Sequence, residues 1–206
     1  MRYGACKVVS KMTDSESRVA DRQRPGKRER LVAAAGQLVY EQGIERTTLA
    51  EIAKAADVPA GNVYYYFKTK DDVIAAVIES HAQQTKAALA VIEQRHRSPK
   101  ERLKALVADF ISQSDIIALY GCPLGSLCSE LDKRVSEPGL PAAELMRVPI
   151  EWAEAQFKSL GREDARDLAF DLLAAYEGSA LLANTMRDPE ILTSAARRID
   201  RWIDAL

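Results

Sequence analysis

The segment from Thr47 to Lys70 constrains the fold of this chain most, because it describes two short helices joined by a tight turn. It reads TTLAEIAKAADVPAGNVYYYFKTK. Thr48 and Glu51 have the spacing of a capping box, which predicts that the first helix begins after Thr48. Asp57 tolerates the left-handed turn that must follow that helix, and Pro59 is suited to opening the second helix. The segment therefore predicts a helix-turn-helix.

The predicted second helix has a surface that suits a binding partner. Its first residues, Ala60, Gly61 and Asn62, are small, and three tyrosines follow at Tyr64 to Tyr66. A helix cannot bury three consecutive positions on one face, so at least one tyrosine is expected to meet solvent or a partner, while Tyr66 is expected to pack in the core. Phenolic hydroxyls bind phosphate, and small residues allow a close approach to base edges. The alternative, that the tyrosines are only core and rim packing, does not explain all three.

This region resembles the TetR family of bacterial transcriptional regulators. The resemblance rests on the stretches TTLAEIAKAADV and GNVYYYFKTKDDV, and it extends from about Arg28 to Val77. Two positions depart from the family pattern: Asp57 stands where the family usually has Gly, and Tyr65 where it often has His. The first departure is expected to stiffen the turn, and the second to alter which DNA sequence is read.

The resemblance implies a fold, partners and a mechanism. It implies an all-α protein in which an N-terminal three-helix DNA-binding unit is joined by a long helix to a C-terminal helical domain for ligand binding and dimerisation. Two recognition helices of a homodimer would enter successive major grooves of a palindromic double-stranded DNA operator. A small-molecule inducer would change their separation and release the DNA.

The resemblance also assigns DNA contacts to positions of this chain: Thr48, Ala60, Gly61, Asn62, Tyr64, Tyr65, Tyr66 and Lys70. Thr48, Tyr64 and Lys70 are expected to bind phosphates. Asn62 and Tyr65 are the candidates for reading bases.

The composition limits where a nucleic acid can bind. The chain has 206 residues with 29 basic and 30 acidic side chains, so a DNA-binding surface must be local. A hydrophobic content of 47% with few aromatic residues fits a helical globular protein. The chain contains no run of about 18 apolar residues and no apolar secretory core, so no membrane span or export signal is expected. Three cysteines without framework spacing indicate the reducing cytoplasm.

Three segments with different roles are expected. Residues 1–26 are predicted to be a disordered basic arm, residues 27–72 the helix-turn-helix DNA-binding domain, and residues 73–206 the ligand-binding and dimerisation domain. The arm is basic because six Lys or Arg stand against two acids between Arg18 and Arg30, and it could add phosphate contacts or be a solvated tail. Met12 is an alternative to Met1 as the start of translation.

Helix signals recur through the rest of the chain. Apolar spacing and capping residues predict helices over 27–42, 70–97, 142–160 and 162–186, a helix opening at Ser98-Pro99, a short helix after Gly125, and a last helix after Asp188-Pro189. The last two helices suit a dimer interface, because one has small residues and two apolar faces; the alternative is that both close the core of one protomer. The interface candidates are Ala175, Gly178, Ser179, Leu182, Ile199, Trp202 and Ile203.

Effector recognition has two sets of candidates in the C-terminal region. The resemblance places an inducer site inside the helical bundle, and the aromatic candidates for its walls are Phe110, Tyr120, Trp152, Phe157 and Tyr176. Cys122 precedes Pro123, so it is expected at the N-cap of a helix, where the positive helix end would lower the pKa of the thiol. GCPLGSL resembles a subgroup whose members include sensors of electrophiles or oxidants. The alternative is a small, buried capping residue.

Two other functional classes compete with DNA binding. An enzyme is disfavoured, because His81 and His96 lack metal-site spacing, GCPLGS lacks the Lys-Ser/Thr end of a phosphate loop, and no GxSxG motif occurs. Acids in apolar helices, namely Glu130, Asp171 and Glu177, leave only a weak case for catalysis. A helical adaptor that binds proteins is the second alternative. We expect no enzyme activity, cofactor or metal, and a repressor that a small molecule or electrophile releases from its operator.

Overall fold

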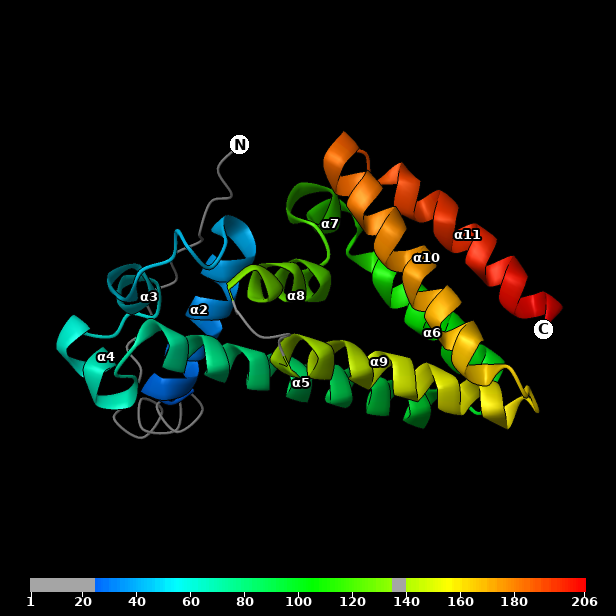
Figure 1. Ribbon diagram of the computed structural model, residues 1–206, viewed down its shortest axis with the longest axis horizontal. Coiled ribbons are helices and arrows are strands. Elements are labelled where there is room, and N and C mark those ends of the chain that lie inside the picture. The colour runs from blue at the N-terminus through cyan, green and yellow to red at the C-terminus, as the bar shows by residue number, and fades with distance from the viewer. Residues whose placement is uncertain (1–24, 135–139) are drawn as a thin grey trace, which may run out of the picture.

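The computed structural model describes residues 25–134 and 140–206, which form ten helices and no strand (Figure 1). The all-α prediction is therefore confirmed. Apart from Pro25 and Gly26, the predicted basic arm lies outside the described residues. The helices are α2 (Lys27–Gln42), α3 (Leu49–Ala55), α4 (Ala60–Tyr66), α5 (Lys70–Arg95), α6 (Pro99–Ser112), α7 (Ser114–Tyr120), α8 (Pro123–Arg134), α9 (Leu140–Ser159), α10 (Ala165–Met186) and α11 (Glu190–Ala205).

Local capping signals fix several helix starts. The Thr48 side chain accepts a hydrogen bond from the Glu51 N–H, and the Glu51 carboxylate accepts one from the Thr48 N–H. The same reciprocal pairs form at Thr69 with Asp72 and at Ser98 with Glu101. Each such cap stabilises a helix start by roughly 1 kcal/mol. The predicted capping boxes are confirmed, because they depend only on residues three positions apart.

The turn of the helix-turn-helix has the predicted left-handed residue. Asp57 has a φ of 51°, and the Val58 N–H donates to the Ala53 carbonyl. Arg30 from α2 holds this turn, because its Nη1 donates to the carbonyls of Ala56 at 3.0 Å and Asp57 at 3.2 Å. Sequence reasoning missed this contact, which joins residues 26 positions apart. The turn is thus supported from outside the motif.

One core joins the DNA-binding helices to the start of the C-terminal region. Leu31, Ile52 and Val63 from α2, α3 and α4 are buried together, and Leu127 from α8 and Leu145 from α9 belong to the same cluster. A second core lies among α5, α6, α9, α10 and α11. Figure 1 shows α5 leaving the helix-turn-helix, with α9 beside its C-terminal part. The long helix therefore contributes buried residues to both cores.

Several predicted helix limits shift by a few residues. α5 ends at Arg95 and not Arg97, α9 begins at Leu140 and includes Pro149, and α10 begins at Ala165 and not Arg162.

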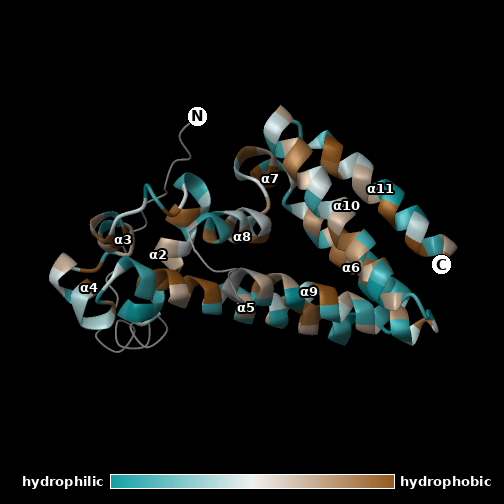
Figure 2. Ribbon diagram, in the orientation of Figure 1, coloured by the Kyte–Doolittle hydropathy of each residue, from teal (hydrophilic) through white to brown (hydrophobic). Residues whose placement is uncertain are grey.

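In the described segments no single helix is long and apolar enough to cross a membrane; only α6 with Ser114–Lys133, a pair bent by 60°, meets the length and composition test. Figure 2 shows hydrophobic and hydrophilic residues interleaved along these helices.

Candidate functional sites

The start of α4 presents an open surface. Tyr64 is 57% exposed and Tyr65 is 78% exposed, so the prediction that at least one tyrosine faces outward is confirmed. A Cβ added at Gly61 would meet no atom within 4 Å, so internal packing does not require a glycine there. Ala60 is also exposed. These four exposed positions of α4 therefore do not fill the core of the protein.

Tyr66 has a different environment. It is partly buried against the N-terminal core, as predicted, and its ring meets the Tyr65 ring edge-on with centroids 5.0 Å apart. Asn62 is half-buried, four residues before Tyr66 on α4. The two outward tyrosines are therefore mounted on a helix that Val63 and Tyr66 anchor.

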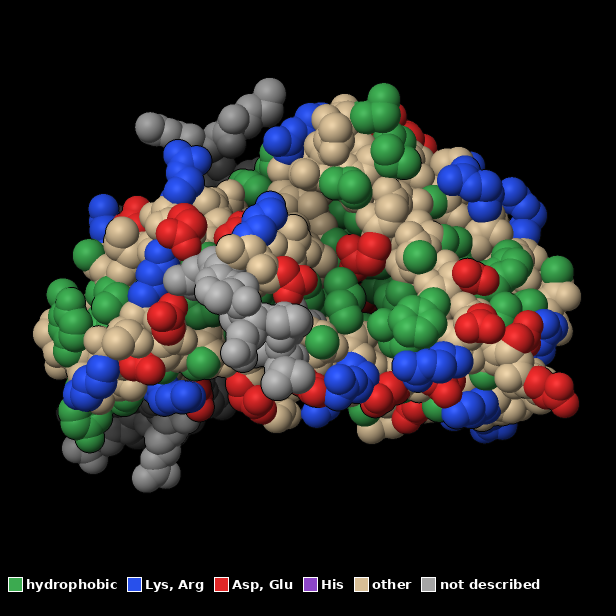
Figure 3. Space-filling view, in the orientation of Figure 1, with side chains coloured by type: hydrophobic (Ala, Val, Ile, Leu, Met, Phe, Trp, Pro, Cys, Tyr) green, Lys and Arg blue, Asp and Glu red, His purple; other side chains and the backbone are tan. Residues whose placement is uncertain are grey.

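Hydrogen bonds to side chains and to backbone carbonyls hold the polar groups around α4. The Thr48 hydroxyl donates to Glu51 at 2.7 Å, and these hydrogen bonds lower the pKa of Glu51. Lys70 Nζ donates to the Glu45 carbonyl at 3.1 Å, and Lys68 Nζ donates to the Tyr64 carbonyl at 2.7 Å. Lys68 is exposed and was missed by the sequence reasoning. Figure 3 shows hydrophobic-class and cationic side chains together at the end of the molecule that α4 occupies.

A cavity of about 170 Å³ lies among α5, α6, α8, α9 and α10. Phe110 and Tyr176 line it, with their rings stacked at a centroid distance of 3.6 Å. The other aromatic candidates do not line this cavity. Tyr120 packs its ring on Tyr40, Trp152 donates from Nε1 to Glu93 at 2.9 Å, and Phe157 is fully buried in the second core.

Cys122 lies at the start of α8, as predicted, but its thiol is not activated. The Ser126 N–H donates to the Cys122 carbonyl at 2.9 Å, and the Gly125 N–H donates to Sγ at 3.4 Å. Burial and the nearby Glu177 carboxylate nevertheless raise the pKa of Cys122 to about 12. The predicted lowering of this pKa is therefore wrong, because desolvation and a negative charge outweigh the helix end.

Glu177 faces Cys122 across the cavity wall. Its Oε1 accepts a hydrogen bond from the Cys122 thiol at 3.2 Å. A Cβ at Gly125 would lie 2.3 Å from Oε2, so the missing side chain at Gly125 makes room for the carboxylate. Burial raises the pKa of Glu177. The other acids named above lie elsewhere: Glu130 accepts from the Ile44 N–H at 2.5 Å, and Asp171 lies in a groove between α10 and α11.

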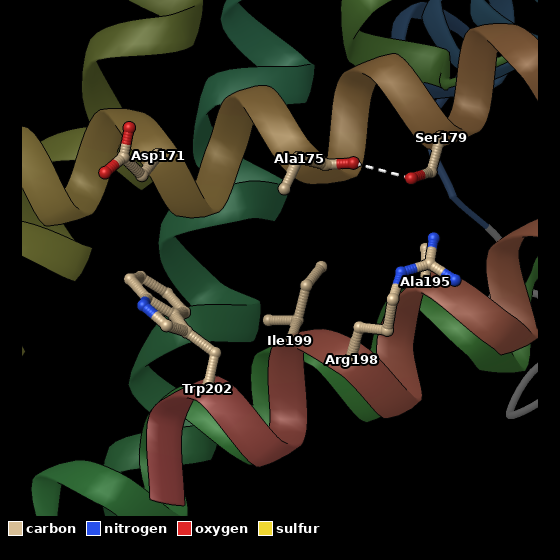
Figure 4. Close-up of a pocket in the computed structure, with 7 residues that line it drawn as sticks. All are labelled: Asp171, Ala175, Ser179, Ala195, Arg198, Ile199 and Trp202. Carbon is tan, nitrogen blue, oxygen red and sulfur yellow. Dashed lines mark hydrogen bonds between the residues drawn. The ribbon is translucent and has the colours of Figure 1, made fainter. Parts of the chain in front are cut away.

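That groove, of about 280 Å³, contains part of the predicted dimer surface (Figure 4). Ala175 and Ser179 of α10 and Ile199 and Trp202 of α11 line it. Gly178 and Leu182 are exposed on α10. Ile203 is wrong as an interface candidate, because its side chain is fully buried in the core of the protomer.

Among residues 25–134 and 140–206, no group of three or more His, Cys, Asp or Glu side chains could hold a metal ion. His81 lies in the wall of the cavity described above, where burial lowers the pKa of the imidazole.

Comparisons with known proteins agree with these features. Residues 31–77 match the family described as "Bacterial regulatory proteins, tetR family". An HTH-type transcriptional regulator from the lacX 3' region of Lactococcus lactis is 29% identical over 81% of this chain and 88% of its own length. The HTH-type transcriptional repressor DhaR of a Mycobacterium species is 28% identical over 80% of this chain and 86% of its own length. A solved TetR transcriptional regulator from Legionella pneumophila superposes with a TM-score of 0.76 at 24% identity, covering 87% of this chain and 98% of its own. Motif, fold and relatives agree, and this chain belongs to the TetR family of DNA-binding transcriptional regulators.

Proposed function

We propose that this regulator acts as a homodimeric repressor that leaves a two-fold symmetric operator when a small molecule enters the cavity among α5, α6, α8, α9 and α10. The observation that carries the DNA-binding part is the unused surface of α4. Exposed tyrosines cost free energy in water unless a partner covers them. Here they stand beside Lys68 and Lys70, which supply the positive charge that phosphates require.

The proposed dimer rests on the outer side of α10. Leu181 is 66% exposed, Leu182 54% and Met186 66%, all within two turns of the helix. The groove between α10 and α11 continues this apolar surface. An apolar surface of this kind is suited to a partner, and a second copy would supply the two-fold symmetry that a palindromic operator demands.

The proposed link between cavity and DNA has two physical routes. α5 lines the cavity with His81, Thr85 and Leu89, and it begins at Lys70 beside α4. α8 begins at the cavity wall and contacts the DNA-binding unit near its other end, where Glu130 accepts from the Ile44 N–H. A ligand that separates α5 from α8 would therefore move the helix-turn-helix.

The test is to select duplexes that the protein retains from a random library and to titrate the best one against salt. We expect a two-fold symmetric sequence and an affinity that falls as salt rises. Lys86→Ala, exposed on α5 away from α4, is the matched control for Lys70→Ala. If the retained duplexes lack two-fold symmetry, binding of DNA by a homodimer is contradicted. If Lys70→Ala and Lys86→Ala lose the same amount of DNA affinity, the phosphate contact assigned to Lys70 is contradicted.

A further inference from the structure

The cavity wall contains a carboxylate that no described cation balances. Glu177 accepts one hydrogen bond, from the weakly acidic thiol of Cys122 at 3.2 Å, and the described part of the chain gives it no ion pair. Its Oε2 lies so close to α8 that a Cβ at position 125 would displace the carboxylate. A half-buried carboxylate without a cation is costly, and burial raises the pKa of Glu177 accordingly.

The other titratable groups in the wall of this cavity add no positive charge. Asp109 from α6 is a second acid in the wall, and His81 from α5 has its pKa lowered by burial, which favours the neutral ring. Cys122 at the start of α8 and Tyr176 beside Glu177 on α10 keep their protons, because burial raises the pKa of both. Lys133 and Glu130 line a separate cavity together with Glu177, and no ion pair between Lys133 and Glu177 occurs among the described residues. Among the described residues that line the first cavity, none is Lys or Arg.

The rest of the wall is apolar and aromatic. Leu89, Ile92, Leu106 and Leu173 enclose the space beside the stacked rings of Phe110 and Tyr176. A volume of about 170 Å³ is close to that of apolar cavities that hold a single benzene ring, roughly 150 Å³. Aromatic faces also attract cations. The cavity therefore combines room for one ring with a carboxylate at its wall.

We propose that this cavity binds an organic cation about the size of one aromatic ring, with its ammonium group on the Glu177 carboxylate and its ring against Phe110 and Tyr176. The proposal rests on the proposed effector role of the cavity and names the chemical class of the effector. The ammonium group of the ligand provides the positive charge beside Glu177 that no Lys or Arg among the described lining residues provides. A neutral or anionic ring of the same size leaves the carboxylate unbalanced.

A charge series of three probes tests this on the free protein. Benzylamine, benzyl alcohol and benzoate have the same ring and carry a positive, zero and negative charge at neutral pH. The affinity of each probe is measured by calorimetric titration of the DNA-free protein. Benzylamine should bind about tenfold or more tightly than benzyl alcohol, because a hydrogen bond to a charged group contributes that factor. Benzoate should bind most weakly.

Substitutions then locate the charge that is responsible. Glu177→Gln keeps the shape and removes the charge, so it should abolish the preference for benzylamine. Glu177→Asp keeps the charge and should retain a preference. Asp167→Asn, exposed on the first turn of the same helix, should behave like the native protein. The thermal transition of each variant shows that it is folded.

Equal affinity for the three probes, a preference for benzoate, or no measurable benzylamine binding at millimolar concentration would overturn the proposal. So would a benzylamine preference that survives in a folded Glu177→Gln variant. Operator release is scored separately. If benzylamine binds selectively and the operator complex stays intact, the cation site is supported and the effector role of the cavity is contradicted. The two proposals can therefore fail independently.

Discussion

The phenol of Tyr40 on α2 donates a 2.7 Å hydrogen bond to the backbone carbonyl of Gly121, the residue that precedes Cys122 in the cavity wall. Gly121 ends α7 with a φ of 87°, a conformation that favours glycine. Because α2 belongs to the helix-turn-helix unit, this hydrogen bond is one link between that unit and the wall of the cavity. Burial raises the pKa of Tyr40 to about 12, so the phenol remains a donor at neutral pH.

Tyr40→Phe should weaken the response of DNA binding to an effector. The variant loses a partly buried hydrogen bond, which destabilises the fold by about 1 kcal/mol. Operator affinity without effector should change little, whereas the effector concentration needed for release should rise. Tyr120→Phe is the control, because its ring packs on Tyr40 and no hydrogen bond from its hydroxyl occurs among the described residues. An equal response in both variants would remove Tyr40 from the link.

Phosphate and base contacts on α4 should be separable by binding assays. Tyr64→Phe and Lys70→Ala should weaken binding to every duplex, and Lys70→Ala should reduce the slope of log affinity against log salt by about 1. Asn62→Ala should change the preferred sequence, with a loss of about 1–3 kcal/mol at one position of the operator. Duplex selection with each variant measures this. If Asn62→Ala retains the native sequence preference, the base-reading assignment fails.

Gly178→Arg should turn the dimer into a monomer. The position is exposed, and an added Cβ meets no atom within 4 Å, so the protomer accepts the longer side chain. In the proposed interface it would bury a charge without a partner, which costs several kcal/mol. Sedimentation measures the mass, and Glu151→Arg, exposed on α9, is the control. A dimer in both variants would move the interface off this face of α10.

The features that the sequence predicted well are local ones. The helix starts at Thr48, Thr69 and Ser98 depend on a partner three residues away, so their capping boxes could be recognised in the sequence. Contacts that join distant segments could not, and Tyr40 with Gly121, 81 positions apart, is the clearest case. Aromatic residues show the same limit. Phe110 lines the cavity whereas Phe157 fills the second core, and the apolar spacing within each helix does not distinguish these two positions.

Cys122 shows a local expectation overruled by a distant residue. The helix start would lower the pKa of the thiol, but Glu177 lies 3.2 Å away and comes from a helix 55 positions later. Burial is the larger cause of the raised pKa, and the carboxylate adds to it. The hypothesis that Cys122 senses electrophiles assumed a lowered pKa of its thiol, so it is not supported. The rate at which Cys122 is alkylated tests this directly.

Alkylation of Cys122 should be slow in the folded protein. A pKa of about 12 leaves the thiol protonated at neutral pH, and the thiolate population is roughly a thousandfold below that of an ordinary thiol of pKa near 9. Since the folded pKa is raised, the folded state favours the protonated thiol; the stability from this preference is complete below pH about 9 and is lost as pH rises toward 12.

Mass spectrometry after iodoacetamide treatment should show slow modification of native protein, fast modification of unfolded protein, and a rate that rises with pH. Glu177→Gln should speed the native reaction, because it removes the negative charge beside Sγ, whereas Asp167→Asn should not. Native Cys122 that reacts at neutral pH as fast as the unfolded chain would contradict the buried, protonated thiol and restore the electrophile sensor.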